Sequence, residues 1–310
     1  MIKDLRIGDI IRGQVFYCSS KTSGISSKGD TYYTVMLQDA SGIISAKIWQ
    51  MGDSIQDFSS NMFVSIEGRV TAYNDTPQIN ITSCSVVLAS MVDISDYCAK
   101  SPKDMDEMVG QLETFVRSVQ NPFLGDLLSS FFMDEVFLTK FKEHSAGKSI
   151  HHAYVGGLLE HTLDVTRICE TLASQYPAIN RDLLITAALF HDIGKVQELT
   201  TFPENDYSDE GTLLGHLFIG AEMIGERARN IEGFPENLLK ELQHCILSHH
   251  GDPQYGAVKQ PMIIEAVALS FADDTDAKLR RFSDMVGSME NTWTDKQDFA
   301  FGSKLRKTLL

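Results

Sequence analysis

The chain has 310 residues, of which 43% are hydrophobic, so it is long for one compact domain and too apolar for a disordered polymer. Its 42 acidic and 27 basic side chains give a net charge of −15, which argues against a protein that coats nucleic acid through bulk electrostatic attraction. Residues 1–90 carry almost none of this charge, with 7 basic and 8 acidic side chains. We therefore expect two domains that differ in electrostatic character.

Several general features of the sequence bear on its location. No apolar run approaches the ~20 residues that cross a bilayer, so we expect no membrane partner. The N-terminus MIKDLRIGDI lacks the layout of a signal peptide, which favours the cytoplasm. The five cysteines are scattered and never form a CxxC pair, so we expect reduced, packed thiols and no disulfides or zinc cluster.

Short stretches rich in β-branched and aromatic residues follow one another from about residue 8 to residue 90. They are GDIIRGQVFY, TYYTVMLQDASG, IISAKIWQ, MFVSIEGRVTAY and PQINITSCSVVL. Turn formers such as SKGD and YNDTP separate them. Five strands with a helix-sized insert at MGDSIQDFSSN predict a small closed barrel, which we assign to residues 1–92.

Two of these predicted strands alternate between two faces. The residues expected to face the barrel core are Tyr33, Val35, Leu37, Ile44, Ala46 and Ile48. The opposite face then carries Tyr32, Met36, Lys47 and Trp49, of which Tyr32, Lys47 and Trp49 are candidates for nucleic-acid binding. The alternative is that Tyr32 and Trp49 pack against the second domain.

After Asp93 the pattern becomes helical. Ser101 before Pro102 indicates an N-cap followed by proline at the first helical position. Apolar residues recur at helical spacing to about residue 288. We expect a helical linker over residues 93–145, a helical bundle over residues 146–290 and a surface arm over residues 291–310.

Histidines and aspartates recur beside apolar helical stretches in this second half. They are His161, His191, Asp192, His216, His249 and Asp273. Their spacing matches one helix plus its connection each time, so consecutive helices would bring them to one interior spot. Any one buried histidine is commonly a hydrogen-bonded core residue. Five helices that each deliver an imidazole or carboxylate favour a metal site instead, because an ion offsets the cost of burying them.

The order of His161, the pair His191-Asp192 in LFHDIGK and the distal Asp273 resembles the signature of the HD-domain metal-dependent phosphohydrolases. The further histidines are similar to those of HD proteins that hold two ions. The ligand sets that this resemblance implies are His161, His191, Asp192 and Asp273 for one ion and Asp192, His216 and His249 for the other. Asp192 would then bridge the two ions.

Several neighbouring residues leave alternatives open. Asp273 is preferred over Asp274 because ADDTDA fits the last motif of the family, with Asp276 as a neighbour on the same helix face. His249 is preferred over His250 as the ligand, although the sequence does not separate them. His250 therefore stays a candidate for metal or phosphate contact.

Three residues receive further roles. His152 lies in HHAYVGGLLEH and is a candidate for metal or phosphate contact, with a surface helix cap as the alternative. Asp192 and Lys195 are the expected catalytic residues, and Lys195 would hold a phosphate oxygen. The alternative for Lys195 is a lysine that faces solvent at a helix end.

The resemblance narrows over HHAYVGGLLEHTL, LFHDIGK and LSHHG. Together with a barrel that resembles a nucleic-acid-binding OB-fold, including its turn at residues 37–44, these segments are similar to the YhaM-type 3′-5′ exoribonucleases of Gram-positive bacteria. This implies a multidomain fold class, with an N-terminal all-β OB-fold barrel followed by an all-α HD-domain helical bundle.

The same resemblance implies hydrolysis of single-stranded RNA from the 3′ end to nucleoside 5′-monophosphates, and it leaves single-stranded DNA open as a second substrate. Two divalent ions would assist, with Mn²⁺ as the expected metal and Fe²⁺, Co²⁺ and Mg²⁺ as the alternatives. Two other functions stay open: an HD-type hydrolase of nucleotides or cyclic dinucleotides, and a nucleic-acid-binding adaptor with an inactive HD bundle. The arm and the barrel edges are also compatible with a homo-oligomer.

Overall fold

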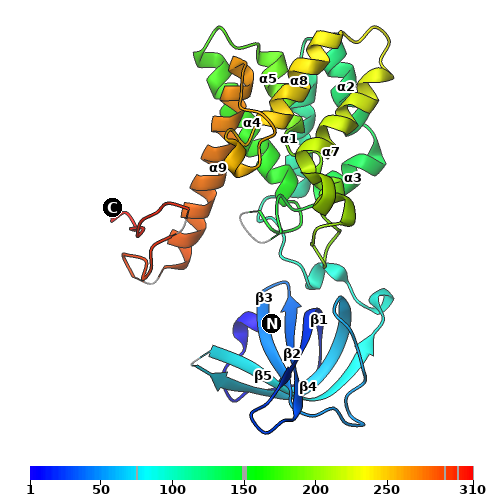
Figure 1. Ribbon diagram of the computed structural model, residues 1–310, viewed down its shortest axis with the longest axis vertical. Coiled ribbons are helices and arrows are strands. Elements are labelled where there is room, and N and C mark those ends of the chain that lie inside the picture. The colour runs from blue at the N-terminus through cyan, green and yellow to red at the C-terminus, as the bar shows by residue number, and fades with distance from the viewer. Residues whose placement is uncertain (75, 149–151, 290, 299, 310) are drawn as a thin grey trace. The chain divides into compact units, whose positions relative to one another are not determined.

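The computed structural model describes residues 1–74, 76–148, 152–289, 291–298 and 300–309 (Figure 1). The chain divides into two compact units. One unit comprises Met1–Pro102 and Thr200–Asp206, and the other comprises Lys103–Leu199 and Tyr207–Leu310. Within the described residues, every helix is too short or too polar to cross a membrane.

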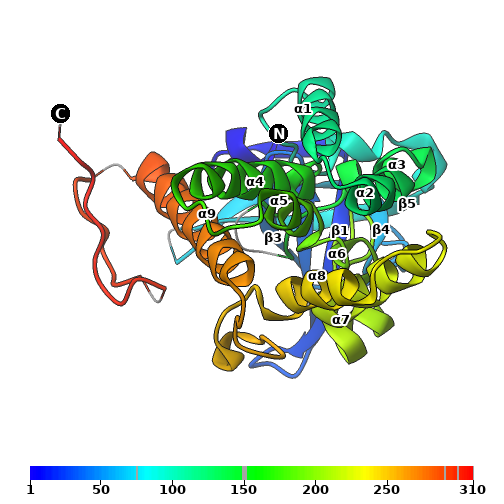
Figure 2. The ribbon, with the colours of Figure 1, turned by 90° about the horizontal axis from the view of Figure 1, so that it is seen from above.

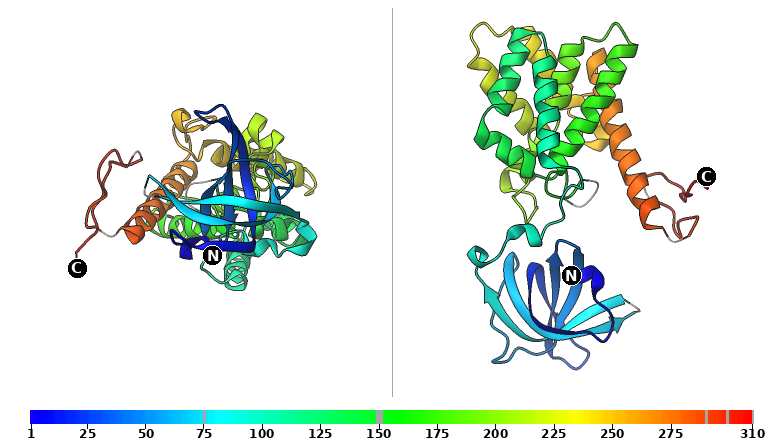
Figure 3. Two further views of the ribbon diagram at one scale, coloured as in Figure 1. Left: turned by 90° about the horizontal axis from the view of Figure 1, so that it is seen from below. Right: turned by 180° about the vertical axis from the view of Figure 1, so that it is seen from behind.

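The first unit contains a closed five-stranded barrel, seen from below in the left panel of Figure 3. Its strands are β1 (Ile10–Ile25), β2 (Thr31–Asp39), β3 (Gly42–Ile48), β4 (Met62–Tyr73) and β5 (Thr76–Val87). Strand β1 pairs antiparallel with β2 and β4, while β2 pairs with β3 and β4 with β5. A parallel pairing of β3 with β5 closes the barrel. This order of strands is OB-like and confirms the predicted barrel.

The barrel core follows the predicted alternation. Val35 and Leu37 of β2 pair in register with Ala46 and Ile44 of β3. Three of these side chains have no exposed surface, and Ile44 is 7% exposed. Tyr33 is only partly buried, at the margin of this core. The alternation therefore identified the buried faces of both strands, because successive strand residues point to opposite sides.

The insert between β3 and β4 differs from the prediction. Residues 51–61 are all described and form no helix. They run as an irregular segment that forms an isolated bridge from Ile55 to Cys84 of β5. Ile55 and Phe58 of the insert are buried in the barrel core. Burial of these two side chains stabilises the irregular segment in place of helical hydrogen bonds.

The second unit is helical, and its helix-forming pattern ends near residue 288 as predicted. Its helices are α1 (Met105–Ser118), α2 (Pro122–Phe132), α3 (Glu135–Glu143), α4 (Gly157–Gln175), α5 (Arg181–Phe190), α6 (Lys195–Glu198), α7 (Asp209–Arg229), α8 (Glu236–Ser248) and α9 (Ile264–Ser288). Short 3₁₀ helices lie in the first unit at Ile2–Asp4, Ala89–Met91 and Ile94–Asp96, and in the second unit at Pro253–Tyr255.

Helix α1 begins later than the sequence suggested. Asp104 is its N-cap, and the Asp104 carboxylate accepts a hydrogen bond from the Glu107 N–H at 3.0 Å. The predicted cap at Ser101 with Pro102 in the first turn is therefore wrong. Both residues precede the helix, and an aspartate is as good a cap as a serine.

Helices α1 to α3 share one hydrophobic core with the later helices. Leu112 of α1, Phe131 of α2 and Phe141 of α3 are buried in the same cluster as Leu159 of α4 and Phe190 of α5. Figure 2 shows α4 beside α5 and α9. Helices α1 to α3, which we expected to form a linker, thus pack within the helical unit. The boundaries of the domains, as given from the sequence, stay a prediction.

The described residues after α9 form an arm of turns and isolated bridges. Trp293 pairs with Arg306, and Asp298 pairs with Ser303. Arg281 of α9 holds this arm through an ion pair with the Asp298 carboxylate at 2.6 Å. The five cysteines of the chain are all buried and free.

Candidate metal centre and nucleic-acid interface

The six predicted metal ligands converge inside the helical unit. His161, His216 and Asp273 lie within α4, α7 and α9, and the remaining residues directly follow α5 and α8. The groups whose ligand atoms all lie within 4.8 Å of one another include His161 with His191 and Asp273, His191 with Asp192 and His249, and His216 with His249 and His250.

The Asp192 carboxylate lies between two groups of imidazoles. Its Oδ2 atom is 3.6 Å from His161 Nε2 and 3.4 Å from His191 Nε2. Its Oδ1 atom is 3.5 Å from His216 Nε2 and 3.7 Å from His249 Nε2. Because each oxygen faces a different group, this carboxylate has the arrangement that is needed to bridge two ions.

Asp273 lies beside His161 and completes its group of ligands, whereas the neighbouring Asp274 does not face the cluster. The Asp273 Oδ1 atom is 3.2 Å from His161 Nε2, and its Oδ2 atom is 4.0 Å from His249 Nε2. Asp274 is exposed and forms an ion pair with Lys278 at 2.8 Å. The geometry therefore favours Asp273 over Asp274 as a ligand.

Four imidazoles are held so that Nε2 points into the cluster. Their Nδ1–H groups donate to acceptors outside it, which are the Asp276 carboxylate for His161 (2.7 Å), the Ala188 carbonyl for His191 (2.8 Å), the Glu198 carboxylate for His216 (2.8 Å) and the Ile246 carbonyl for His249 (2.8 Å). A hydrogen bond at Nδ1 fixes the tautomer whose Nε2 lone pair is available to a metal.

The electrostatics of the cluster suit cation binding. Burial raises the pKa of Asp192, but opposing interactions, above all the charge of Lys195, outweigh burial and hold the pKa of this carboxyl well below its usual range. Burial and the charge of His250 lower the pKa of His249 well below its usual value. At neutral pH these residues therefore present a carboxylate and a neutral imidazole, which are the forms that bind metals.

His161 behaves differently. Burial lowers its pKa, but hydrogen bonds to Asp273 and Asp276 outweigh burial and raise the pKa of His161 to about 10. Without a cation this imidazole is therefore protonated at neutral pH. Binding of a cation at Nε2 would release that proton, as is usual when metals bind to titrating ligands.

The hydrogen bonding of two buried atoms indicates whether the residues fit a metal. Within the described residues, neither Asp192 Oδ1 nor His249 Nε2 has a hydrogen-bond partner. An unsatisfied buried polar group costs about 1–3 kcal/mol, and a cation between these atoms would offset that cost. Mixed imidazole and carboxylate donors are suited to divalent first-row metals such as Mn²⁺, Fe²⁺ and Co²⁺. The residues present therefore fit a divalent ion.

Lys195 is not the solvent-facing lysine of the alternative interpretation. Its side chain is 15% exposed, and its ammonium is 3.0 Å from Asp192 Oδ2. It also donates a hydrogen bond to the Ala146 carbonyl. Burial lowers the pKa of Lys195, but the Asp192 charge outweighs burial and raises it, so the ammonium stays charged.

His250 and His152 contact different members of the cluster. The Nε2 atoms of His250 and His216 are 3.3 Å apart, which places His250 beside the second group of ligands. His152 is 1% exposed, so it is not a surface helix cap. Its Nε2 atom is 3.3 Å from the Asp276 carboxylate, and its Nδ1 atom is 2.9 Å from the Tyr154 hydroxyl.

Glu198 is a residue that the sequence did not reveal. Its Oε1 atom accepts hydrogen bonds from the His216 N–H at 2.9 Å and from Nδ1 at 2.8 Å. Burial raises the pKa of Glu198, but the hydrogen bond and charge of His216 outweigh burial and lower it. The contact depends on how α6 packs against α7, so no local sequence pattern indicates it.

Changing Glu198 to glutamine is expected to weaken binding of manganese by about tenfold, because partners of metal ligands typically contribute 10–100-fold and glutamine retains part of the hydrogen bond. Isothermal titration calorimetry with MnCl₂ measures this. Glu222→Gln, at an exposed position of α7, is the control and should bind manganese as the wild type does. Equal affinities of all three proteins would exclude a role for Glu198 in orienting His216.

The barrel carries the candidate nucleic-acid interface. The rings of Tyr32 and Trp49 lie 5.4 Å apart, and Lys47 Nζ is 4.5 Å from the Tyr32 ring centroid. The indole N–H of Trp49 donates to Asn80 at 3.2 Å. These three predicted residues therefore do come together on one face of the barrel.

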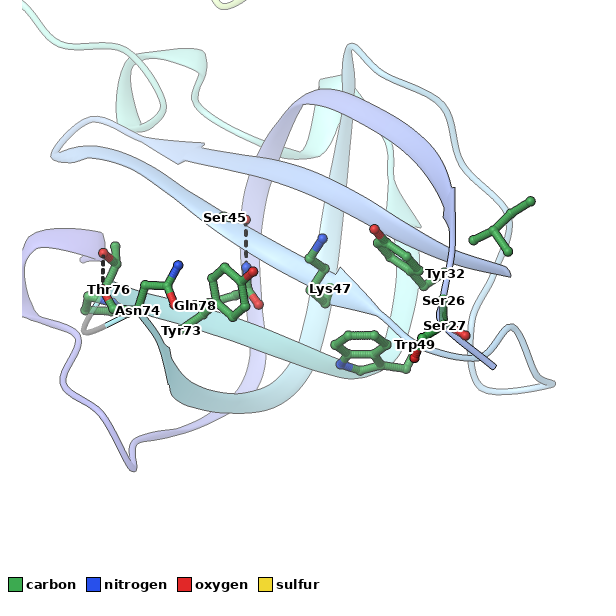
Figure 4. Close-up of a pocket in the computed structure, with 12 residues that line it drawn as sticks. Ser26, Ser27, Tyr32, Ser45, Lys47, Trp49, Tyr73, Asn74, Thr76 and Gln78 are labelled. Atoms are coloured by element: carbon green, nitrogen blue, oxygen red, sulfur yellow. Dashed lines mark hydrogen bonds between the residues drawn. The ribbon is translucent and has the colours of Figure 1, made fainter. Parts of the chain in front are cut away.

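A groove of about 680 Å³ runs over this face (Figure 4). Tyr32 and Trp49 lie at one end, Lys47 lies between, and Tyr73 lies toward the other end. Gln78 donates to the Ser45 hydroxyl at 3.1 Å within the groove. Tyr73 is 65% exposed and was missed from the sequence, where it reads only as the last residue of a strand before a turn.

Comparison with known proteins assigns part of the helical unit to a domain family. Residues 158–278 match the family model of the HD domain. The chain is therefore an N-terminal five-stranded OB-like barrel followed by a helical HD domain, which confirms the predicted fold class. HD domains bind divalent metals, which agrees with the clusters of histidine and aspartate described above.

Solved structures also resemble parts of the chain. The second OB-fold domain of replication protein A from Methanococcus maripaludis is 15% identical over 28% of this chain and 92% of that chain, with a TM-score of 0.22. The HD domain of the L. monocytogenes phosphodiesterase PgpH is 18% identical over 50% of this chain and 80% of that chain, with a TM-score of 0.31. The same domain in complex with cyclic-di-AMP is 20% identical over 50% of this chain and 74% of that chain, with a TM-score of 0.31.

Proposed function

We propose that the chain is a metal-dependent 3′-5′ exoribonuclease that hydrolyses single-stranded RNA to nucleoside 5′-monophosphates. The observation that carries this proposal is the position of the Asp192 carboxylate, whose two oxygens face two separate groups of imidazoles. Tyr32, Lys47 and Trp49 of the barrel support single-strand binding, because aromatic rings beside a cation suit stacked bases and phosphates.

We propose two sites for divalent cations. One would be held by His161, His191, Asp192 and Asp273, and the other by Asp192, His216 and His249 with His250 beside it. When bound, a pair of divalent ions neutralises phosphate oxygens and makes water acidic enough to supply the nucleophile. We propose Mn²⁺ as the metal, since its preference for mixed nitrogen and oxygen donors matches this set.

The protein's own groups would prepare the site for this chemistry. Lys195 contacts Asp192 at 3.0 Å, and its positive charge would assist binding of a phosphate at the cluster. Asp276 and Glu198 fix the rings of His161 and His216 by accepting from Nδ1. These contacts hold the ligands before substrate arrives, so little reorganisation is needed during the reaction.

The experiment that tests the function uses RNA labelled at the 5′ end, incubated with the protein and MnCl₂. Stepwise shortening from the 3′ end with release of nucleoside 5′-monophosphates would support the proposal. Single-stranded DNA, free nucleotides and cyclic dinucleotides are assayed in parallel. Hydrolysis of nucleotides or cyclic dinucleotides without cleavage of RNA would favour the alternative HD hydrolase. Binding of RNA without turnover of any substrate would favour the inactive adaptor.

Changing Trp49 to alanine is expected to lower kcat/KM for single-stranded RNA about tenfold relative to a small phosphodiester, because one stacked base is worth about 1–3 kcal/mol. The measurement is the ratio of the two kcat/KM values in one preparation. Trp293→Ala is a matched control, because both tryptophans are 53% exposed and Trp293 lies in the arm. An unchanged ratio in the Trp49 variant would exclude stacking of a base on this side chain.

A further inference from the structure

A second groove opens directly on the candidate metal centre. It has a volume of about 650 Å³ and is lined by His249, His250 and Asp273 of the cluster together with Phe271 and Lys278 of α9. Sites that bind small molecules commonly measure about 300–1,000 Å³. The groove therefore has room for part of a substrate whose reacting phosphate lies at the cluster.

Phe271 is the notable residue of this groove. It lies on α9 two residues before Asp273 and is 66% exposed. The neighbours that anchor α9 in the core are Ala268, Leu269 and Ala272. Phe271 is thus not needed to pack the helix. Its ring offers an uncovered aromatic surface within the same groove as the ligand atoms.

The turn after His250 also lines the groove. Gly251 has φ +75°, which few residues other than glycine adopt. A Cβ atom at Gly251 would lie 2.8 Å from the Ser270 hydroxyl oxygen of α9. Glycine therefore permits the turn to approach α9 one residue before Phe271, and it defines the groove on that side.

The charges of the groove indicate which part of a nucleic acid it fits. Asp252, Asp273 and Asp274 line it, whereas its lysine, Lys278, is paired with Asp274 at 2.8 Å. Beyond the metal ligands this surface has an acidic excess and would repel a second phosphate. A neutral base stacked on Phe271 suits it better than a stretch of backbone.

We propose that this groove is a nucleoside subsite, in which Phe271 stacks on the base of the nucleotide whose phosphate lies at the metal centre. The inference rests on the proposed function and names where the substrate's terminal base is held. Every nucleobase has an aromatic face, so the subsite accepts all four bases with little discrimination. Its affinity comes from the ring and is absent for a sugar phosphate without a base.

The test compares binding of adenosine 5′-monophosphate and ribose 5-phosphate to the manganese-loaded full chain by isothermal titration calorimetry. The base is expected to improve the dissociation constant of the wild type about tenfold, in the range of one stacking contact. The ratio of the two dissociation constants should fall to about one in Phe271→Ala, and Phe271→Tyr should retain the wild-type ratio. Leu279→Ala is the matched control, because Leu279 is 63% exposed on α9 outside the groove, and it should retain the wild-type ratio.

An unchanged ratio in Phe271→Ala would overturn the subsite. A change of oligomeric mass in that variant, measured by light scattering and without loss of the ratio, would overturn it too and make Phe271 a contact between copies. Failure of the subsite is distinguishable from failure of the proposed function. In the first case the wild type cleaves RNA although the ratio is insensitive to Phe271, and in the second it cleaves no RNA.

Discussion

Asp192→Asn is expected to lower metal-dependent cleavage of RNA at least about a thousandfold, which corresponds to about 4 kcal/mol of transition-state stabilisation. The reason is geometric, because the two oxygens of this carboxylate face different groups of imidazoles. Oδ2 is 3.4 Å from His191 Nε2, and Oδ1 is 3.7 Å from His249 Nε2. Asparagine has the same size but presents a neutral oxygen and an NH₂ group, so it cannot bridge two cations. The measurement is the single-turnover rate at saturating MnCl₂.

The matched control is Asp274→Asn, an exposed carboxylate next to Asp273 that does not face the cluster. It should cleave RNA at the wild-type rate. Circular dichroism of both variants separates loss of chemistry from loss of fold. Wild-type cleavage by folded Asp192→Asn would refute the bridging role.

Gly194→Ala is expected to destabilise the helical unit by about 3 kcal/mol, and a Tm lower by about 6–12 °C follows for a unit of this size. Gly194 directly precedes α6 and has ordinary helical φ of −66°, so the effect is steric. A Cβ atom there would overlap the His216 carbonyl oxygen and lie 2.7 Å from the Gly220 N atom of α7. Both obstacles are backbone atoms, so the two segments would have to separate. Thermal unfolding followed by circular dichroism measures the change.

Gly110→Ala provides the comparison, because Gly110 is exposed on α1 and a Cβ atom there meets nothing within 4 Å. Alanine favours helix by up to about 1 kcal/mol, so this variant should be slightly more stable than the wild type. Because His216 moves with the displaced backbone, Gly194→Ala should also bind manganese more weakly. Equal Tm values for the two variants would contradict the close approach of these segments.

The sequence revealed the parts of the fold that depend on local periodicity. Alternation identified Val35 and Ala46 as core residues of the barrel, and helical spacing gave the extent of the helical half. It failed where two local signals compete, since Asp104 rather than Ser101 caps α1. It failed again in the insert, where Phe58 is buried without any regular structure.

The candidate site could be predicted from the sequence for a similar reason. His191 and Asp192 are adjacent in an apolar stretch, and the cost of burying two such side chains is reason enough to expect a metal beside them. The residues that position the ligands or shape the groove were harder to predict from the sequence. Glu198 reaches His216 only through the packing of α6 on α7, and the turn at Gly251 is set by contact with α9. Contacts between elements carry no signature within either element.

The most direct test of the central claim is the number of ions that the chain binds. Purified protein is dialysed to equilibrium against MnCl₂, and the bound metal is counted by mass spectrometry for the wild type, Asp192→Asn and the Asp274→Asn control. We predict two manganese ions per chain in the wild type and the control, and at most one in Asp192→Asn. A wild-type chain that binds none, or an Asp192→Asn chain that still binds two, would contradict the account.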